Sequence, residues 1–403
     1  MEITNVTGVV VEGNFDWPLI RVDTDEGVSG YGEVRDHGRG FGHTETHYVD
    51  DMLDLALDLE PVLEGRDPTN VAGVFEAVRS RGGWGRLGGG VSAVEMACWD
   101  VAGKHLDAPA WKLLGGKYRD EVRVYCDCRA GNPVSDSAVD YGLAENDYSP
   151  AAYADHAEEV EGMGFDFLKF DLDPNALAYV TGEEGVRGDS LTRAGREYLV
   201  DVVEALREAL SPDTDVGFDC ASMRSLPVDD VVRFGRAVDR YDVAALEDLQ
   251  PDADVTGWKE ITERIDTPTI TGEDLYAREG FRELVRRDAV DMVGPDLLTA
   301  GGIRETVRIG EFAGAHGMPT NLHFAASPVG FAASVHAAAA IEDLLALEFH
   351  AVGVPWWDEL VEEDLFADGY APVPERPGLG VTPDEDAIRE HARDPERAEG
   401  FVR

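Results

Sequence analysis

Six acidic or basic residues recur at nearly equal intervals through the second half of the chain. They are separated by 28, 26, 23, 27 and 25 residues, and each one ends or follows a short apolar run. A repeat of this length accommodates one strand, one helix and two short loops. In a barrel built from such units, the carboxyl ends of all strands meet at one face. The spacing therefore predicts that six side chains face a common pocket: Asp219, Glu247, Glu273, Asp296, His323 and Glu348.

Apolar runs that alternate with helical stretches predict a closed parallel barrel. Helical periodicity lies between the runs, for example over 151–163 and 196–210. This alternation is typical of a parallel sheet, and eight strands suffice to close it. The interval from Lys169 to Asp219 is twice the usual repeat, so 182–193 is expected as a loop inserted over the barrel mouth. The eight expected strands are 122–128, 167–172, 216–218, 243–246, 267–272, 290–295, 318–322 and 344–347.

The first part of the chain has a different pattern and is expected to form an α+β domain. Residues 2–34 alternate in a way that predicts a small antiparallel sheet. Apolar residues recur at helical spacing over 43–65, 69–81 and 90–106. We therefore divide the chain into an α+β domain (1–118), a barrel (119–354) and a C-terminal segment that returns to the first domain (355–403).

The chain is strongly acidic, with a formal net charge of -46 from 81 acidic and 35 basic residues. Such a charge repels itself at ordinary ionic strength, whereas ~1 M salt screens charges within ~3 Å. The composition therefore favours a halophilic protein, from an organism with a salty interior, over an acidic mesophilic protein. It disfavours a nucleic-acid partner, because binding to phosphates needs a basic face.

The N-terminus and the cysteines indicate the compartment. Residues 1–11 lack a basic segment with a long apolar stretch, and no run approaches the ~18 apolar residues of a membrane span. The cysteines show no second pair at zinc-site spacing, so we interpret Cys98, Cys126, Cys128 and Cys220 as buried thiols. We expect a cytoplasmic protein without a membrane partner.

Three carboxylates of the series are suited to a divalent cation. Asp219, Glu247 and Glu273 would repel one another at a barrel mouth, and each would raise the pKa of the others. Binding of Mg²⁺ removes this repulsion and leaves coordination positions for substrate oxygens. The alternative is that each carboxylate caps a helix or forms an ion pair. Their places at successive strand ends favour a magnesium site.

The next two members of the series suit a general base. An aspartate beside a histidine fixes the tautomer and makes the imidazole more basic, so Asp296 and His323 are expected to form a catalytic pair. Lys169 is one of only 5 lysines, which suggests a point-charge contact to a substrate carboxylate, with a buried ion pair as the alternative. A cation and a base in one pocket suit removal of the proton next to a carboxylate. We interpret the other histidines as structural or of unknown role, among them His316, His336 and His350.

An ordered set of motifs resembles the enolase superfamily, in its mandelate racemase/muconate lactonising branch. The resemblance covers nearly the whole chain. The motifs are VSGYGE (28–33), AVEMACWDVAG (93–103), LLGGKYR (113–119), GED (272–274), PD (295–296) followed by GG (301–302), and PGLGV (377–381).

This resemblance implies an α/β fold, a modified TIM barrel of the (β/α)₇β type with an α+β N-terminal capping domain. It implies Mg²⁺ on the three carboxylates, Asp296 and His323 as the base pair, and Glu348 as a hydrogen-bonding partner of the substrate carboxylate. Loops near 14–17 and 35–42 would close over the substrate, with Trp17 among its contacts. Members of this branch are often dimers or octamers, so the resemblance also implies a homo-oligomer.

Departures from the family pattern bear on the reaction. The second strand ends Lys169-Phe170-Asp171, where a second lysine is usual, and Ala221 stands where some sugar-acid dehydratases have an acid histidine. A Lys-x-Asp strand followed by a long loop resembles sugar-acid dehydratases, and Asp171 is expected to contact the substrate. We therefore expect dehydration of an aldonate to a 2-keto-3-deoxy acid, by a hydro-lyase. The alternatives are a racemase, epimerase or cycloisomerase of the same fold, and a non-catalytic sugar-acid-binding protein.

Overall fold

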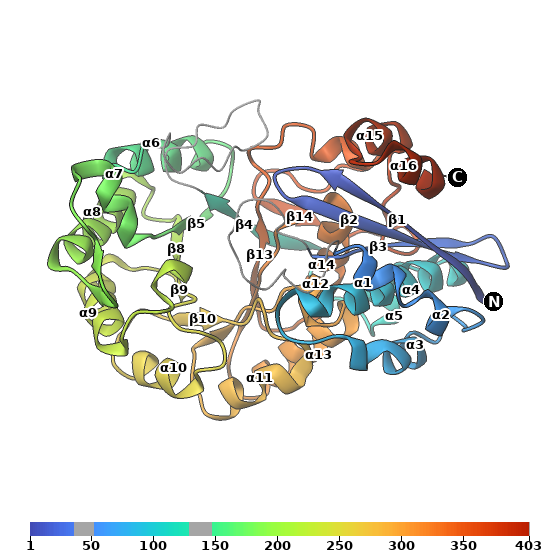
Figure 1. The fold of residues 1–403 in the computed structure, drawn as a ribbon, viewed down its shortest axis with the longest axis horizontal. Coiled ribbons are helices and arrows are strands. Elements are labelled where there is room, and N and C mark those ends of the chain that lie inside the picture. Colours follow the sequence, from blue (N-terminus) through green and yellow to red (C-terminus); the bar gives the residue numbers. More distant parts are fainter. Residues whose placement is uncertain (36–51, 129–146, 403) are drawn as a thin grey trace.

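The computed structural model describes residues 1–35, 52–128 and 147–402, and it consists of a parallel barrel beside a smaller sheet-and-helix unit (Figure 1). The smaller unit starts with an antiparallel sheet in the order β1-β2-β3. Its elements are β1 (Ile3–Glu12), β2 (Asp16–Thr24), β3 (Ser29–Glu33), α1 (Asp54–Leu57), α2 (Glu60–Leu63), α3 (Val71–Val78), α4 (Gly89–Leu106) and α5 (Ala110–Leu113). The antiparallel sheet and the helices near 69–81 and 90–106 agree with the sequence prediction.

Helix α4 lies directly on strand β3, and two glycines permit this contact. A Cβ added at Gly30 would lie 2.2 Å from a carbonyl oxygen of α4, and one at Gly32 would lie 2.0 Å from another. Glycine inside a strand often marks such a close approach of two backbones. The Gly-x-Gly sequence therefore holds β3 on α4, and the residues at and after its end, Glu33 and Arg35, reach the barrel.

The single helix expected over 43–65 is wrong in its described part. Residues 43–51 lie outside the described residues, and the rest forms two separate four-residue helices, α1 and α2. Pro61 lies in the first turn of α2. A proline is tolerated in a first turn but not inside a helix, because it has no N–H to donate. The apolar spacing gave the buried face correctly: Leu53, Ala56, Leu59 and Leu63 are buried.

Eight parallel strands close the barrel, which confirms the predicted fold class. The strand order is β4-β5-β8-β9-β10-β11-β12-β13, and β13 pairs with β4. Strands β9 and β11 are shorter than the apolar runs that predicted them. The strands are β4 (Glu121–Cys128), β5 (Phe167–Asp171), β8 (Asp215–Asp219), β9 (Leu246–Glu247), β10 (Thr269–Thr271), β11 (Met292–Val293), β12 (Thr320–Leu322) and β13 (Leu344–Phe349).

Helices lie outside the barrel between successive strands (Figure 1). They are α6 (Pro150–Glu161), α8 (Arg193–Ala209), α9 (Val228–Val238), α10 (Val255–Thr262), α11 (Ala277–Arg286), α13 (Ile303–Gly314) and α14 (Pro328–Ala340), with the short α7 (Leu177–Thr181) and α12 (Leu297–Ala300). None of the helices in the described ranges is long and apolar enough to cross a bilayer.

The insertion expected over 182–193 contains a small hairpin. Strands β6 (Val186–Arg187) and β7 (Ser190–Leu191) pair in antiparallel fashion. The hairpin lies between α7, which follows the carboxyl end of β5, and the start of α8. It therefore belongs to the end of the barrel where the carboxyl ends of the strands meet.

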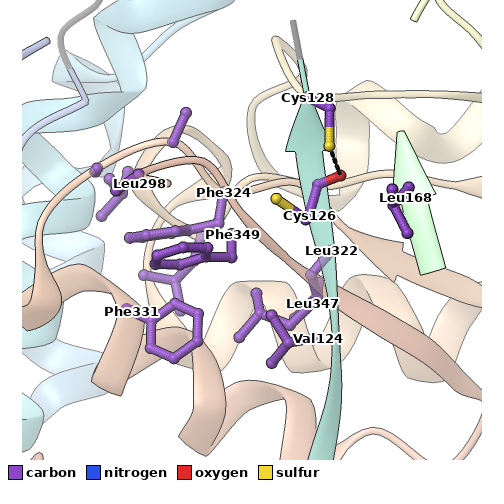
Figure 2. Packing of buried hydrophobic residues seen from close by; sticks show 14 of the residues in the cluster. Val124, Cys126, Cys128, Leu168, Leu298, Leu322, Phe324, Phe331, Leu347 and Phe349 are labelled. Atoms are coloured by element: carbon purple, nitrogen blue, oxygen red, sulfur yellow. Dashed lines mark hydrogen bonds between the residues drawn. The ribbon is translucent and has the colours of Figure 1, made fainter. Parts of the chain in front are cut away.

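Alternate side chains of β4 face two different environments. Val124 and Cys126 face outward into the large core, and Figure 2 shows Val124 beside Leu347. Tyr125 belongs to a separate small apolar cluster, and its hydroxyl reaches a carboxylate at the last barrel strand. Because side chains of a strand alternate between its two faces, Asp127 points into the barrel one step nearer the mouth. The interior of the barrel is therefore apolar around Tyr125 and polar at the carboxyl ends of the strands. All four cysteines are buried and unpaired thiols, as expected.

The C-terminal segment runs back to the first sheet. Strand β14 (Tyr370–Pro372) pairs antiparallel with β4. Helices α15 (Glu385–His391) and α16 (Pro395–Val402) then lie beside β1 and β2 (Figure 1). The backbone nitrogen of Arg393 donates to the carbonyl oxygen of Val10 at 2.9 Å. The two ends of the chain are thus parts of one unit next to the barrel.

A buried carboxylate ties α4 to the barrel. Glu95 accepts hydrogen bonds from the backbone nitrogens of Ile303 (2.7 Å) and Arg304 (3.1 Å) and from the indole of Trp99 (2.7 Å). The two backbone donors are the first amides of α13, which have no partner within their helix and favour a negative charge. Burial, partly offset by these bonds, raises the pKa of Glu95 to about 7.

Replacing Glu95 with Ala is expected to lower the free energy of unfolding by about 3–5 kcal/mol, because one buried and two partly buried donors lose their acceptor and a cavity is left. Urea unfolding followed by circular dichroism measures the change. Glu311→Ala, an exposed glutamate on α13, is the matched control and should change stability by less than about 0.5 kcal/mol. A loss of less than about 1 kcal/mol for Glu95→Ala would show that water or a shifted side chain takes over these bonds.

Candidate active site

The residues of the periodic series meet at one end of the barrel. Asp171, Asp219 and Glu247 stand at the same level on β5, β8 and β9, since the first pairs with the second and the second with the third. Asp296 and His323 form a parallel bridge just beyond β11 and β12. The structure therefore brings together at the strand ends the residues singled out in the sequence: Lys169, Asp219, Glu247, Glu273, Asp296, His323 and Glu348.

Lys169 is the central cation of this end of the barrel. Its Nζ lies 2.7 Å from Oε1 of Glu348, 2.9 Å from Oε2 of Glu247 and 3.8 Å from Oδ2 of Asp219. Burial acts to lower the pKa of Lys169, but the carboxylates of Glu247 and Glu348 hold it well above its usual value. The side chain is therefore a fixed positive charge. The alternative of a buried ion pair is what the structure contains, and the contact to a substrate carboxylate stays a prediction.

Glu273 is surrounded by three cationic side chains. Its Oε2 lies 2.8 Å from Nε2 of His323 and 3.5 Å from Nη2 of Arg35, and its Oε1 lies 3.5 Å from Nη2 of Arg224. Burial acts to raise the pKa of Glu273, but His323 and Arg35, followed by Arg224, hold it well below the usual value. Glu273 is thus a firmly ionised carboxylate.

The three expected metal ligands carry the donor chemistry of a magnesium site. Burial raises the pKa of Asp219 to about 7, and neighbouring carboxylates add to this effect. Burial likewise raises the pKa of Glu247, with Asp219 contributing. Within the described ranges no three His, Cys, Asp or Glu side chains converge at metal-ligand spacing, since these carboxylates turn toward the cationic groups named above. Three carboxylates on successive strand ends nevertheless supply the hard oxygen ligands that suit Mg²⁺, and a cation would relieve their repulsion.

Asp296 and His323 form the expected pair. Nδ1 of His323 lies 2.7 Å from Oδ2 of Asp296. The other oxygen of Asp296 accepts from the backbone nitrogen of Leu298 at 2.6 Å, which caps α12. Asp296 is fully buried. Because the helix end and the imidazole together fix this carboxylate, Nε2 of His323 is directed toward the carboxylates at the barrel mouth.

The imidazole is held in its charged form by its surroundings. Burial acts to lower the pKa of His323, but the carboxylates of Glu273 and Glu348 hold it well above its usual value. While Glu273 stays paired with Nε2, this nitrogen cannot accept a proton. The role of His323 as a base stays a prediction, and it requires that Glu273 move away from Nε2.

Glu348 stands between Lys169 and His323. Its Oε2 accepts from the hydroxyl of Tyr125 and from the backbone nitrogen of Phe324, both at 3.0 Å, and it lies 3.7 Å from Nε2 of His323. The side chain has no exposed surface. Glu348 therefore has a fixed orientation at the middle of the site.

The predicted substrate contacts lie in different environments. Asp171 is partly exposed and stands beside Asp219 on the neighbouring strand. Trp17 is fully buried, with its ring 5.5 Å from that of Trp356. Of the expected loop over 35–42, only Arg35 is described, and 36–42 lie outside the described residues. The contacts of Trp17 and Asp171 with a substrate stay predictions.

The ion pairs that two arginines form at the site were not predicted. Arg35, after β3, contacts Glu273, Asp274 and Asp296. Arg224 pairs with Asp248. Burial raises the pKa of Asp248 to about 7, although the charge of Arg224 acts to lower it. A signal was present for Asp248, since it directly follows a predicted ligand. Arg35 was expected only as the first residue of a loop over the substrate, because its contacts with the carboxylates depend on how the first unit packs on the barrel.

Comparison with known families covers both parts of the chain. The sequence profile described as the mandelate racemase/muconate lactonizing enzyme N-terminal domain matches residues 9–115. The profile described as enolase C-terminal domain-like matches residues 152–387. The second match alone spans more than half of the chain, and the two occur in the order of the fold.

Individual proteins agree with these matches. A D-xylonate dehydratase of Haloferax volcanii is 38% identical over 97% of this chain and 89% of its own length. A D-gluconate dehydratase of Thermoproteus tenax is 26% identical over 94% of this chain and 70% of its own. The crystal structure of a mandelate racemase/muconate lactonizing enzyme-like protein from Rubrobacter xylanophilus has a TM-score of 0.85 at 30% identity, over 98% of both chains. Fold, ordered site residues and profile matches agree, and the chain belongs to the mandelate racemase/muconate lactonizing enzyme branch of the enolase superfamily.

Proposed function

We propose that the protein is a hydro-lyase that dehydrates an aldonate-type sugar acid to a 2-keto-3-deoxy acid. The observation that carries this proposal is the pair of His323 and Asp296 directed at a cluster of carboxylates around Lys169. Such a cluster suits binding of a substrate carboxylate through a cation, next to a base for its α-proton. The named relatives are dehydratases of sugar acids, and they support this choice of substrate class.

The proposed reaction begins at the carbon next to the substrate carboxylate. Nε2 of His323 takes the proton from this carbon, and the C–H electrons form an enediolate with the carboxylate. These electrons then form the C2–C3 double bond as the C3–O bond breaks. The leaving hydroxide takes a proton, from His323 or another acid, and departs as water. The remaining enol tautomerises to the 2-keto-3-deoxy acid, so atoms and charge balance without a redox partner.

We propose that Asp219, Glu247 and Glu273 hold the Mg²⁺ of this site. When bound, Mg²⁺ supplies positive charge for the two carboxylate oxygens, on which negative charge grows during proton removal. Lys169 adds a fixed charge at the same end of the substrate, because its pKa is held high by its neighbours. Glu348 orients the substrate through its fixed carboxylate, and Asp296 keeps the tautomer of His323 that presents Nε2.

Composition and family also support proposals about the compartment, the domain roles and the oligomeric state of the protein. A net charge of -46 suits the cytoplasm of an organism with a salty interior, where the charge is screened. We propose that residues 1–118 act as the capping domain of the barrel, and that the protein is a homo-oligomer, a dimer or an octamer.

A screen of five- and six-carbon aldonates with Mg²⁺ in molar KCl tests the proposed reaction. We expect at least one acid to yield a 2-keto-3-deoxy product, detected by its reaction with semicarbazide or thiobarbiturate. Exchange of the α-proton with solvent deuterium without loss of water would instead indicate a racemase or epimerase. Tight binding without exchange or turnover would indicate a binding protein.

A further inference from the structure

A second pair of histidine and carboxylate lies at the barrel mouth, apart from His323 and Asp296. Nε2 of His350 is 2.7 Å from Oδ2 of Asp127, and both side chains are largely buried. The strand register explains the contact. Phe349 of β13 pairs with Cys126 of β4, so the next residue of each strand, His350 and Asp127, stands at the same level.

This pair borders the cluster of residues proposed for the reaction. Asp127 points into the barrel, because the alternate residues of β4, Cys126 and Cys128, face the outer core. Oδ1 of Asp127 lies 3.8 Å from Nζ of Lys169. Lys169 in turn contacts Glu348, which stands two residues before His350. The pair is therefore connected to the catalytic cluster through the lysine.

The tautomer of His350 is fixed by the capping domain. Nδ1 of His350 lies 3.3 Å from the side-chain nitrogen of Asn14, which also donates to the backbone oxygen of His350 at 2.8 Å. The amide orientation follows from its oxygen, which accepts from the nitrogen of Phe15 at 3.1 Å. Since an amide nitrogen can only donate, Nδ1 accepts, and the proton lies on Nε2, where it is donated to Asp127.

Both ring nitrogens of His350 thus contact protein groups. The side chain of this pair that faces the barrel interior is the carboxylate of Asp127. We propose that Asp127 is a substrate-recognition residue that accepts hydrogen bonds from hydroxyl groups of the sugar acid beyond the reacting carbons. His350 and Asn14 are its positioning residues. The inference rests on the proposed dehydration of a sugar acid and specifies how that substrate class is selected.

The location of Asp127 determines which hydroxyl groups of the substrate it contacts. The catalytic cluster around Lys169 and Glu348 holds the end of the substrate that bears the carboxylate. Asp127 lies between this cluster and Asn14, on the side where the capping domain meets the barrel. Hydroxyls farther along the sugar chain extend to this side.

A fixed, buried carboxylate discriminates strongly between hydroxylated and deoxygenated ligands. It accepts hydrogen bonds and cannot donate them, so a ligand with hydroxyl donors satisfies it. A ligand that lacks these donors makes no such hydrogen bonds with Asp127, so it binds less tightly. Sites built to bond a substrate hydroxyl reject the analogue that lacks it by large factors.

The test compares an aldonate with glycerate, which has the carboxylate and the two reacting hydroxyls but no others. The discrimination ratio is kcat/KM for the preferred aldonate divided by kcat/KM for glycerate, measured with Mg²⁺ in molar KCl. We expect Asp127→Asn to lower this ratio tenfold or more, because the amide has lost the charge and one acceptor oxygen. His350→Leu should lower it similarly, whereas His350→Gln should restore most of it, because a glutamine amide can donate to Asp127.

The controls separate positioning from structural damage. His316→Leu replaces an exposed histidine after α13 and should leave the ratio unchanged. Asn14→Ala removes the contacts of the amide with His350 and Phe15 but leaves Asp127 and His350 in place. It should lower the ratio by a smaller factor, so it serves if Asp127→Asn does not fold. An unchanged ratio in Asp127→Asn, or equal losses for both substrates, would overturn the inference.

Binding measurements distinguish this inference from the proposed reaction. Isothermal titration gives the Kd of aldonate and glycerate for the wild type and for Asp127→Asn. If the wild type turns over no sugar acid but binds an aldonate more tightly than glycerate, and Asp127→Asn loses this preference, the reaction is wrong and the recognition role stands. A wild type without any preference for the aldonate overturns the recognition role.

Discussion

Replacing His323 with Asn is expected to lower kcat by about 10³-fold or more, because the site loses the base proposed for the α-proton. The nitrogen of the asparagine amide can still donate to Asp296 in place of Nδ1, which now lies 2.7 Å from this carboxylate. No atom of asparagine reaches the position of Nε2. The variant should therefore keep the cap of α12 and the fold while losing the proton transfer. Turnover and exchange of the α-proton with solvent deuterium, measured on the same substrate, check both parts of this expectation.

The comparison with His316→Asn shows whether the loss is specific. His316 is exposed, and its ring contacts the backbone oxygen of Phe312, so this variant should have wild-type activity and a similar melting temperature. His323→Asn with normal turnover would rule out His323 as the base. A His323→Asn variant that still exchanges the α-proton, but no longer loses water, would instead assign His323 to protonation of the leaving hydroxide.

The sequence predicted the ring of candidate site residues because the repeat of the barrel has a fixed physical length. One strand, one helix and two loops occupy about 25 residues. The residue after each apolar run then falls at the same end of the sheet, as Asp219 and Glu247 do in neighbouring strands. The chemistry of each side chain could be inferred from its type, without knowledge of any contact between strands.

The residues that sequence reasoning passed over depend on contacts between distant segments. His350 follows Glu348 by two positions, and only the pairing of β13 with β4, which closes the barrel, places it beside Asp127. Arg35 reaches Glu273 because the first sheet packs on the barrel. The expected helix over 43–65 was wrong for a local reason, since its apolar spacing continues across the break before Pro61. Periodicity in the sequence thus predicts the buried faces of helices and the repeat of the barrel. The remaining side-chain contacts depend on closure of the barrel and on packing of the first unit against it.

Removal of divalent cations is expected to stop both dehydration and exchange of the α-proton. In the proposed reaction, the enediolate places a second negative charge on a substrate carboxylate bound near Glu348 and Glu247. Lys169 alone cannot balance these charges, because it is already shared between those two carboxylates. Loss of the several kcal/mol that a metal ion contributes corresponds to at least about a 10³-fold decrease in kcat. The experiment uses a chelator at constant KCl concentration, followed by return of Mg²⁺, and the metal content is measured at each step.

The variant Glu247→Gln tests the proposed ligand set without relying on activity. It removes one of three negative charges at the site, so Mg²⁺ should bind more weakly and raise the melting temperature less than it does in the wild type. Glu311→Gln removes an equal charge from the exposed face of α13 and controls for the net charge of the chain. Equal Mg²⁺ affinities for the two variants, or full turnover by protein whose metal content is below stoichiometry after chelation, would contradict the assignment. In that case Asp219, Glu247 and Glu273 would serve as partners of Lys169, His323 and the two arginines, and the positive charge near the enediolate would come from these side chains alone.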